Sequence, residues 1–192
     1  MIKLYHTRIQ DQPMAVDCLP YLKESERRRL EATSPLTAKR RWALLYMIQN
    51  LCQETGLPLS VLSCLWHSAD GKPYLGPYYM SVSYSGAFAF CAFSKENIGI
   101  DAERMDPRNA ERLIPVFNEF YGMGVQDTGS FYKEWTKLES LIKYDGAESI
   151  SSMIHSAKRL DAIHTSYLTL EDGYMIAVST ENDKRILPVH IA

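Results

Sequence analysis

The chain has 192 residues, 46% of them hydrophobic and 23% charged, and its formal net charge is −2. This length suffices for one large domain or for two smaller halves that share a core, and the composition is ordinary for a globular protein. A slightly acidic chain without a long basic run argues against a nucleic-acid partner, and no apolar run reaches membrane-spanning length. We therefore expect neither a nucleic-acid partner nor a membrane segment.

The cysteines indicate a cytoplasmic protein, while the histidines argue against a zinc site and the N-terminal residues against a signal peptide. The four cysteines form no C-x-x-C pair, and three of them lie in apolar surroundings, as reduced packing residues do. The five histidines show no spacing typical of metal ligands, which argues against a zinc site. Residues 1–12 lack a basic region followed by an apolar core, so they predict no signal peptide.

The first half of the chain predicts a strand, two helices and then several strands. Residues 36–55 are the clearest helix, because Leu44, Ile48, Leu51 and Cys52 fall on one stripe. Residues 69–73 have the composition of a turn. The expected elements are a strand at 1–6, helices at 21–32 and 36–55, a strand at 61–66, a strand leading into the polar cluster at 81–86, and a buried strand at 87–93.

The second half predicts a similar succession of helices followed by strands. The expected elements are a strand at 98–100, helices at 109–121 and 130–144, and strands at 159–164, 167–170, 174–179 and 186–190. Residues 86–97 resemble residues 173–183 faintly, which indicates an internal duplication. We therefore predict an α+β fold made of two halves that face each other.

Two acids follow the strand at 98–100 with a single residue between them. Asp101 and Glu103 would point to the same side of an extended backbone. Two carboxylates on one side repel each other unless a positive group lies between them, and Mg²⁺ is a cation that carboxylate oxygens bind readily. The alternative is that both acids belong to a solvated turn, as most isolated D-x-E patterns do.

Glu139 and the basic run at 39–41 can likewise be interpreted either as functional residues or as ordinary surface residues. Glu139, on the helix at 130–144, could be a third acid beside Asp101 and Glu103, but with Lys143 it also forms an ordinary i, i+4 surface pair. The basic run at 39–41, which contains Arg40, begins the helix at 36–55 and could simply be a solvated face.

In chain order these features resemble the Sfp-type 4′-phosphopantetheinyl transferases. The hallmarks of that family are G-K-P, S-H-S, G-I-D-x-E, and W-x-x-K-E-S followed by a lysine. The corresponding residues here are Arg40, then Gly71-Lys72-Pro73, Ser83-Tyr84-Ser85-Gly86, Gly99-Ile100-Asp101-Ala102-Glu103, and Trp135-Thr136-Lys137-Leu138-Glu139-Ser140 with Lys143. Each motif is moderately specific alone, and their order makes the resemblance strong.

The resemblance implies a fold and a reaction. The family transfers the phosphopantetheine arm of coenzyme A to a serine of an apo carrier protein and releases adenosine 3′,5′-bisphosphate. Its fold is a pseudo-twofold pair of similar α+β halves with coenzyme A in the cleft between them. Residues 1–98 would form the half that contacts the nucleotide, and residues 99–192 the half that carries the metal and the catalytic acids. A self-contained pair of halves also favours a monomer.

Roles for individual residues follow from the same resemblance. Asp101, Glu103 and Glu139 would hold Mg²⁺ against the diphosphate, although oxygen ligands also suit Mn²⁺. Glu139 would accept the serine proton, and Lys143 would contact a phosphate oxygen. The nucleotide would be bound by Arg40, with Arg27 or Arg29 as helpers at its 3′-phosphate, and by Gly71, Lys72, Pro73, Ser83, Tyr84 and Lys137.

The chain departs from the family pattern at two positions. Tyr84 replaces the histidine of S-H-S and offers a hydroxyl without a positive charge. Leu138 replaces the lysine of W-x-x-K-E-S, with Lys137 one position earlier and therefore rotated by about 100° around the helix. Both changes reduce positive charge near phosphate and leave the acids in place, so we expect weaker coenzyme A binding or slower turnover.

Two other functions compete with the active transferase. One is an inactive or weakened family member that binds coenzyme A or carrier proteins. The other is a serine hydrolase, which we discard because Ser81 stands where its motif requires glycine before Ser83. The aromatic-rich segment 117–131, with Phe120 and Met123, could dock a carrier protein, although core packing is the commoner use of such residues. The sequence leaves the carrier type open.

Overall fold

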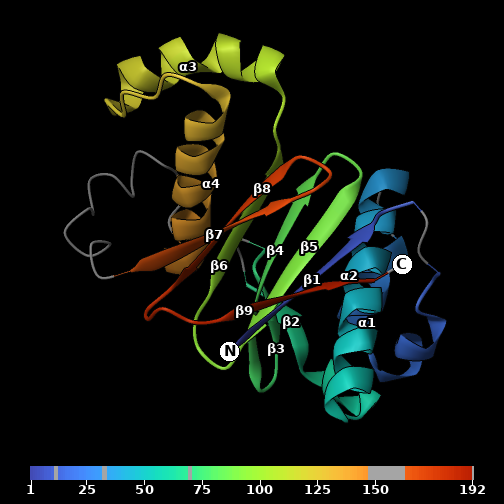
Figure 1. The fold of residues 1–192 in the computed structure, drawn as a ribbon. Coiled ribbons are helices and arrows are strands. Elements are labelled where there is room, and N and C mark those ends of the chain that lie inside the picture. Colours follow the sequence, from blue (N-terminus) through green and yellow to red (C-terminus); the bar gives the residue numbers. More distant parts are fainter. Residues whose placement is uncertain (11–12, 32–33, 69–70, 147–162, 192) are drawn as a thin grey trace. The chain divides into compact units, whose positions relative to one another are not determined.

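The computed structural model describes residues 1–10, 13–31, 34–68, 71–146 and 163–191 (Figure 1). By their contacts they divide into two compact units, which we call unit 1 (Met1–Ile98 with Lys184–Ala192) and unit 2 (Gly99–Asp183). Each unit contains α-helices and a β-sheet, which confirms the α+β class. The pseudo-twofold relation between the two halves stays a prediction.

Unit 1 is built on a six-stranded sheet with the strand order β2-β3-β4-β5-β1-β9. All neighbouring strands are antiparallel except β1 and β9, which run parallel. Its elements are β1 (Ile2–Arg8), a 3-10 helix (Val16–Tyr21), α1 (Glu24–Glu31), α2 (Pro35–Thr55), a 3-10 helix (Leu59–Cys64), β2 (Leu65–His67), β3 (Pro73–Leu75), β4 (Tyr78–Ser85), β5 (Phe88–Ser94) and β9 (Ile186–His190).

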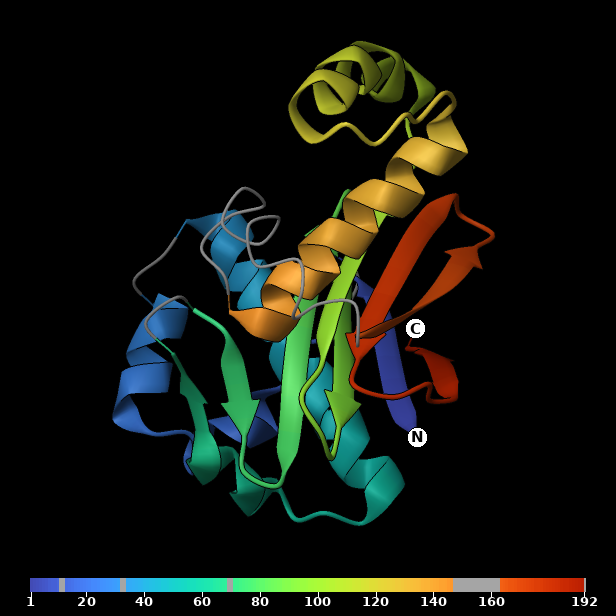
Figure 2. The same ribbon diagram turned by 90° about the vertical axis from the view of Figure 1, so that its left-hand side faces the viewer.

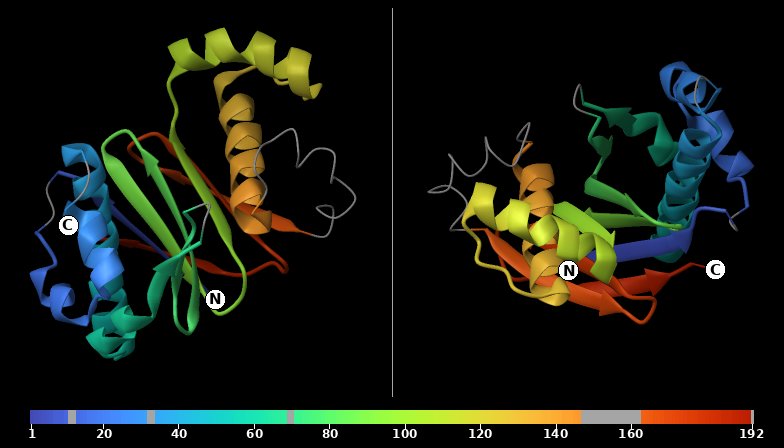
Figure 3. Two further views of the ribbon diagram at one scale, coloured as in Figure 1. Left: turned by 180° about the vertical axis from the view of Figure 1, so that it is seen from behind. Right: turned by 90° about the horizontal axis from the view of Figure 1, so that it is seen from above.

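Helix α2 covers one face of this sheet, and α1 lies beside it (Figure 3). The helix begins where Ser34 accepts a hydrogen bond from the backbone N–H of Thr37, with Pro35 at its first position. Its predicted apolar stripe is buried, because Leu44, Ile48, Leu51 and Cys52 are at most 6% exposed. This stripe packs against the inward residues of β1, β4 and β5 and forms the core of unit 1.

Two expectations for unit 1 differ from the structure. The predicted strand at 61–66 is wrong, because most of it forms the 3-10 helix Leu59–Cys64 and only Leu65–His67 is extended. The apolar residues at 61, 62 and 65 suit a short buried helix as well as a strand. The last strand, β9, belongs to the sheet of unit 1 and pairs with β1, whereas the sequence placed residues 99–192 together in one half.

Unit 2 packs one long helix on a three-stranded antiparallel sheet with the order β6-β8-β7. Its elements are β6 (Gly99–Arg104), α3 (Pro107–Tyr121), α4 (Thr128–Asp145), β7 (His164–Leu170) and β8 (Tyr174–Thr180). Helix α3 lies across the N-terminal end of α4 (Figure 2). The core between them contains Phe117, Phe131, Leu138 and Leu141, none of them more than 5% exposed.

The termini of α4 are set by local signals in the sequence. Asp127 and Ser130 form a reciprocal capping box at its start. Gly146 ends the helix with a φ of 73°, a conformation that glycine adopts without strain. Nearly all of the expected strand at 159–164 falls on residues outside the described ones. Among the described residues, no helix is long and apolar enough to cross a membrane.

Candidate active site

In unit 2 the site is built on β6, whose sequence Gly99-Ile100-Asp101-Ala102-Glu103 alternates between two faces. Ile100 and Ala102 are fully buried on one face. Gly99, Asp101 and Glu103 lie on the other, because successive side chains of a strand point to opposite sides. The expected placement of both acids on the same side of a strand is therefore observed. Asp101 is only 4% exposed, so it is not part of a solvated turn.

Helix α4 approaches β6 unusually closely at Gly99. A Cβ atom at this position would lie 1.9 Å from the carbonyl oxygen of Ser140 and 2.6 Å from the backbone nitrogen of Tyr144. The hydroxyl of Ser140 also lies 2.7 Å from that of Ser179 on β8. The absent side chain of Gly99 thus lets the backbone of α4 touch the strand that carries Asp101.

This close approach brings together three of the predicted residues, Asp101, Glu139 and Lys143. The ammonium of Lys143 donates a hydrogen bond of 2.7 Å to Oδ1 of Asp101. Burial raises the pKa of the Glu139 carboxyl, the nearby charge of Asp101 raises it further, and Lys143 opposes both effects. A half-buried carboxylate with a raised pKa is a stronger base than an ordinary surface glutamate, which suits it to accept a proton.

The other predicted residues of unit 2 lie around this group. Glu103 is half-buried on β6, two residues beyond Asp101. Within the described ranges, no three histidine, cysteine, aspartate or glutamate side chains are grouped as ligands of a metal ion. Lys137 is partly exposed, with its Nζ 4.0 Å from Oε2 of Glu134 one turn earlier on α4. Lys143 is therefore the cation that the structure places on Asp101.

Leu138 occupies a core position, which explains why this chain can lack a lysine there. It is 5% exposed and packs among the apolar residues of unit 2. We expect Leu138→Lys to lower the free energy of unfolding by at least about 2 kcal/mol, because it replaces a buried leucine with a charge. Urea denaturation checks this, with Leu138→Met as the volume-conserving control. Unchanged stability together with tighter coenzyme A binding would contradict the placement.

In unit 1 the predicted nucleotide-binding residues lie on two segments. Gly71-Lys72-Pro73 leads into β3, and Nζ of Lys72 donates a hydrogen bond of 3.2 Å to Oδ1 of Asn97. The backbone N–H of Gly71 donates to the carbonyl of Ser68, and that of Ser68 to the carbonyl of Lys72, whereas residues 69–70 of the expected turn lie outside the described ones. Ser83 on β4 is 4% exposed.

Tyr84, which replaces the family's histidine, contacts Arg40. The guanidinium carbon of Arg40 lies 5.1 Å from the centroid of the tyrosine ring, and the Tyr84 hydroxyl donates a hydrogen bond of 3.3 Å to the Arg40 carbonyl. Burial raises the pKa of the Tyr84 hydroxyl, so it stays neutral. Tyr84 therefore positions Arg40 and adds no positive charge of its own.

Arg40 belongs to a larger group, which we call the arginine cluster: Arg29 on α1 with Arg40 and Arg41 on α2. Nε of Arg29, Nε of Arg40 and Nη1 of Arg41 are buried and make no hydrogen bond within the described residues. Burial lowers the pKa of Arg41, and the charge of Arg29 lowers it further. Buried guanidinium N–H groups without acceptors are costly, and a phosphate would supply the missing acceptors.

The sequence identified only part of this cluster. Arg40 was predicted directly and Arg29 as one of two possible helpers, whereas Arg27 donates to the carbonyl of Pro20. Arg41 entered the sequence analysis only as part of the basic run at 39–41, for which a solvated face was the alternative interpretation. Glu26 and His67, which contact each other beside the cluster, were missed. No spacing rule connects these two, because α1 and β2 are brought together by tertiary packing.

Comparison with known proteins gives one informative similarity. Over 126 residues the chain is 34% identical to the 4′-phosphopantetheinyl transferase Sfp of Bacillus subtilis (strain 168), and the match covers 55% of this chain and 56% of that protein. The chain thus spans about half the length of this curated relative. No family model matches the chain. The similarity supports a transferase of the Sfp kind at the level of the family.

Proposed function

We propose that this protein transfers the 4′-phosphopantetheine arm of coenzyme A to a serine of an apo carrier protein and releases adenosine 3′,5′-bisphosphate. The observation that carries the proposal is the group of Asp101, Glu139 and Lys143, held together by the contact of α4 with β6. An isolated surface pair would explain Glu139 and Lys143 but not their association with a buried aspartate. The similarity to Sfp supports the same assignment.

The proposed reaction requires little covalent chemistry from the protein itself. The serine oxygen forms a bond to the β-phosphorus of coenzyme A, and the bond from that phosphorus to the bridging oxygen breaks. The bridging oxygen leaves with the nucleotide, and the serine proton goes to a base. Such phosphoryl transfers depend on positioning and on neutralising charge. Glu139, with its raised pKa, is the base, and Lys143 binds a phosphate oxygen as a point charge.

The donors around Asp101 are of the kind that a hard divalent cation binds, although no three of them are grouped as its ligands in the described part of the chain. They are carboxylate oxygens, and Oδ1 of Asp101 already binds a positive group, the ammonium of Lys143. The repulsion between Asp101 and Glu139 that raises the pKa of Glu139 is what a cation would relieve. We assign Asp101, Glu103 and Glu139 as the residues that would hold Mg²⁺. The ion would supply charge neutralisation at the diphosphate.

The arginine cluster supplies positive charge for the nucleotide part of coenzyme A. Its three buried N–H groups that lack acceptors among the described residues match the oxygens of a phosphate monoester, and arginine binds such oxygens in a bidentate manner. We therefore assign the 3′-phosphate to this cluster, with Tyr84 positioning Arg40. In this proposal the segment Gly71-Lys72-Pro73 and the buried Ser83 complete the nucleotide contacts, with Lys137 as a further phosphate contact.

A weakened or inactive transferase is the second candidate, and one observation favours it. The lysine expected at position 138 is a core leucine, and Lys137 pairs with Glu134. Lys143 then carries more of the charge neutralisation alone. This candidate predicts binding of coenzyme A with slow or no transfer.

A mass-spectrometric assay tests the proposed function. The protein is incubated with coenzyme A, Mg²⁺ and a panel of apo carrier proteins of the fatty-acid, polyketide and peptide types. A carrier that gains one phosphopantetheine supports the transferase. Coenzyme A binding without modification of any carrier supports the inactive candidate, and neither binding nor modification rejects both.

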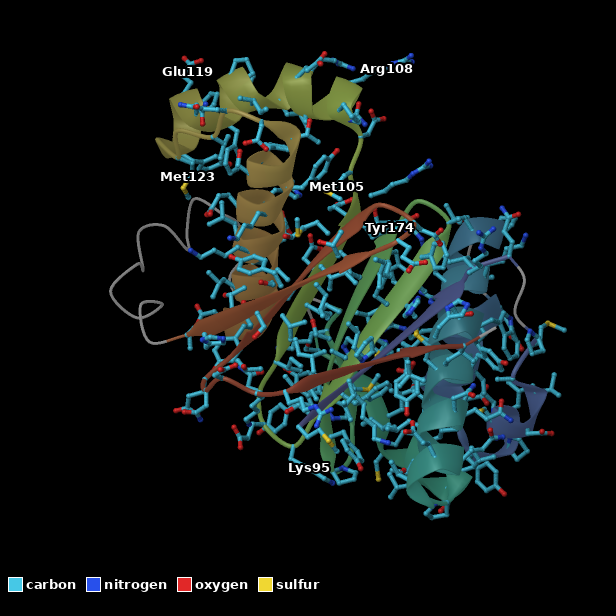
Figure 4. All side chains as sticks on the ribbon, viewed as in Figure 1. Lys95, Met105, Arg108, Glu119, Met123 and Tyr174 are labelled. Carbon is cyan, nitrogen blue, oxygen red and sulfur yellow. The ribbon has the colours of Figure 1, made fainter. Side chains whose placement is uncertain are left out.

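Helix α3 presents an exposed apolar stripe that we propose as the docking surface for the carrier. Leu113, Val116 and Phe120 are 46%, 49% and 74% exposed, although Phe117 between them is in the core. Arg108 and Glu119 lie at opposite ends of this helix, and Met123 follows it (Figure 4). Carrier proteins, as the resemblance implies, present an acidic helix beside their serine.

Replacing Phe120 and Met123 by alanine should weaken carrier binding by about tenfold, because Phe120 is an exposed aromatic side chain of the kind that dominates such interfaces. Met123 is partly buried against the core of unit 2 beside it. The KM for the carrier should rise while kcat and the KM for coenzyme A stay unchanged. Leu36→Ala, which removes an apolar side chain that is 54% exposed on α2, is the matched control. An unchanged KM for the carrier in the folded double variant would place docking elsewhere.

A further inference from the structure

A buried acid–base pair lies directly beside the arginine cluster. Nδ1 of His67 on β2 is 3.1 Å from Oε1 of Glu26 on α1, and both side chains are at most 12% exposed. Because a carboxylate can only accept hydrogen bonds, Nδ1 must carry the proton that is shared with Glu26. Nε2 is then the nitrogen on which neutral His67 can take up a second proton.

Several charged groups face His67 from the elements packed around it. Helix α1 contributes Glu26 and Arg29, whose Nε lies 3.9 Å from Oε2 of Glu26, and α2 contributes Arg41. From β4, Tyr84 faces Arg41. Glu26, Arg29, Arg41 and His67, but not Tyr84, line a cavity of about 20 Å³, which has room for about one water molecule. Its other walls are the apolar residues Leu22, Leu30, Leu44, Leu45 and Leu65.

Without a bound anion, this arrangement disfavours a charged histidine. Burial lowers the pKa of His67, Arg29 and Arg41 lower it further, and Glu26 acts in the opposite direction. His67 is therefore neutral at pH 7. Glu26 meanwhile interacts with both His67 and Arg29, while the arginine cluster retains buried N–H groups without acceptors among the described residues.

A bound dianion changes each of these interactions. Its oxygens would accept from the arginine cluster and neutralise the field of Arg29 and Arg41 at His67. Glu26, no longer shared with Arg29, would then act on His67 alone. Both changes favour the imidazolium, which would form a buried ion pair with Glu26. The binding of a phosphate group and the protonation of His67 thus stabilise each other.

We propose that Glu26 and His67 make the arginine cluster a proton-coupled anion site, in which binding of a phosphate monoester is accompanied by uptake of a proton at Nε2 of His67. The inference rests on the proposed function in that the anion would be the 3′-phosphate of coenzyme A. Its wider consequence is that the nucleotide is held more tightly at lower pH. His67 is then a positioning residue that acts through Glu26 and the arginines.

The sign of the pH dependence follows from linkage. The pKa of His67 is lower in the free protein than in the anion complex. Between these two pKa values the complex binds more protons than the free protein. Anion affinity therefore weakens as pH rises through this window, by at most about tenfold per pH unit for one proton. Below and above the window, the anion affinity does not change with pH through His67, because the free protein and the complex carry the same number of protons there.

Titration calorimetry with sulfate tests this directly, because sulfate remains a dianion throughout the neutral range. Measured in buffers with different ionisation enthalpies, the heat of binding should show uptake of a fraction of a proton at pH 7. His67→Gln, which can still donate to Glu26, should bind sulfate without proton uptake. Glu26→Gln, which removes the carboxylate that stabilises the imidazolium, should also abolish the proton uptake. The control is His164→Gln, which replaces an exposed histidine of unit 2 and should retain the uptake. Arg41→Gln should weaken sulfate binding and so assign the heat to the cluster.

Each result separates the inference from the proposed function. Sulfate binding whose heat does not depend on the buffer overturns proton coupling, even if carriers are modified. No sulfate binding overturns the anion site itself. Proton uptake that disappears in His67→Gln but persists in His164→Gln supports the inference, and it does so even if no carrier protein is modified.

Discussion

Replacing Glu139 by glutamine is expected to lower the rate of phosphopantetheine transfer by about 100- to 10,000-fold, the usual contribution of a positioned general base. Glutamine keeps the size of the side chain but can neither accept the serine proton nor carry the negative charge that Mg²⁺ requires. Burial and Asp101 raise the pKa of Glu139, so its neighbourhood already favours a neutral side chain. The substitution should therefore leave the free energy of unfolding unchanged or slightly higher.

The measurement is the initial rate of carrier modification, followed by mass spectrometry with coenzyme A in excess. Glu134→Gln is the matched control, because Glu134 lies on the same helix and pairs with Lys137 at the surface. It should keep the wild-type rate within about twofold, since surface ion pairs contribute little. A Glu139→Gln variant that retains the wild-type rate would show that another group takes the proton.

The parts of the site that the sequence predicted correctly depend on local periodicity. Asp101 and Glu103 share one side of β6 because alternate residues of any strand do. The helices expected at 36–55 and 130–144 are observed as α2 and α4, whose starts are set by neighbouring residues such as Ser34 and Asp127. Such features require no knowledge of the tertiary fold.

The parts that the sequence missed depend on packing between distant segments. The parallel pairing of β9 with β1 joins the two ends of the described chain, and nothing in the sequence of either strand indicates which strand it pairs with. Glu26 and His67 are 41 residues apart. In the sequence Leu138 only marks the loss of the family's lysine, whereas the structure shows that it is a core residue of unit 2. Burial that arises from tertiary contacts cannot be deduced from the periodicity of one helix.

Gly99 was recognised as part of a motif, and the structure supplies its physical role. Gly99→Ala should lower the free energy of unfolding of unit 2 by about 3 kcal/mol or more, at the upper end of overpacking effects. The added Cβ would lie 1.9 Å from a backbone oxygen of α4, and backbone atoms cannot rotate away as a flexible side chain can. Urea denaturation followed by circular dichroism measures the loss.

Gly129→Ala is the matched control, because it lies in the first turn of the same helix. A Cβ there would meet only the side chain of Asp127, at 3.2 Å, and alanine is the better helix former by about 1 kcal/mol. Its stability should stay close to that of the wild type. If Gly99→Ala unfolds at the same urea concentration as Gly129→Ala, the close contact between α4 and β6 does not exist in solution.

The same substitution also tests how the active site is assembled. If Gly99→Ala still folds, α4 must move away from β6 by about 1 Å or more to reach an ordinary van der Waals distance. Glu139 and Lys143 move with the helix, while Asp101 stays on the strand. A catalytic group displaced by this distance can lose about 100-fold in rate. A folded Gly99→Ala variant should therefore have lost transfer activity while retaining sulfate binding at the arginine cluster, since Arg29, Arg40 and Arg41 lie in unit 1.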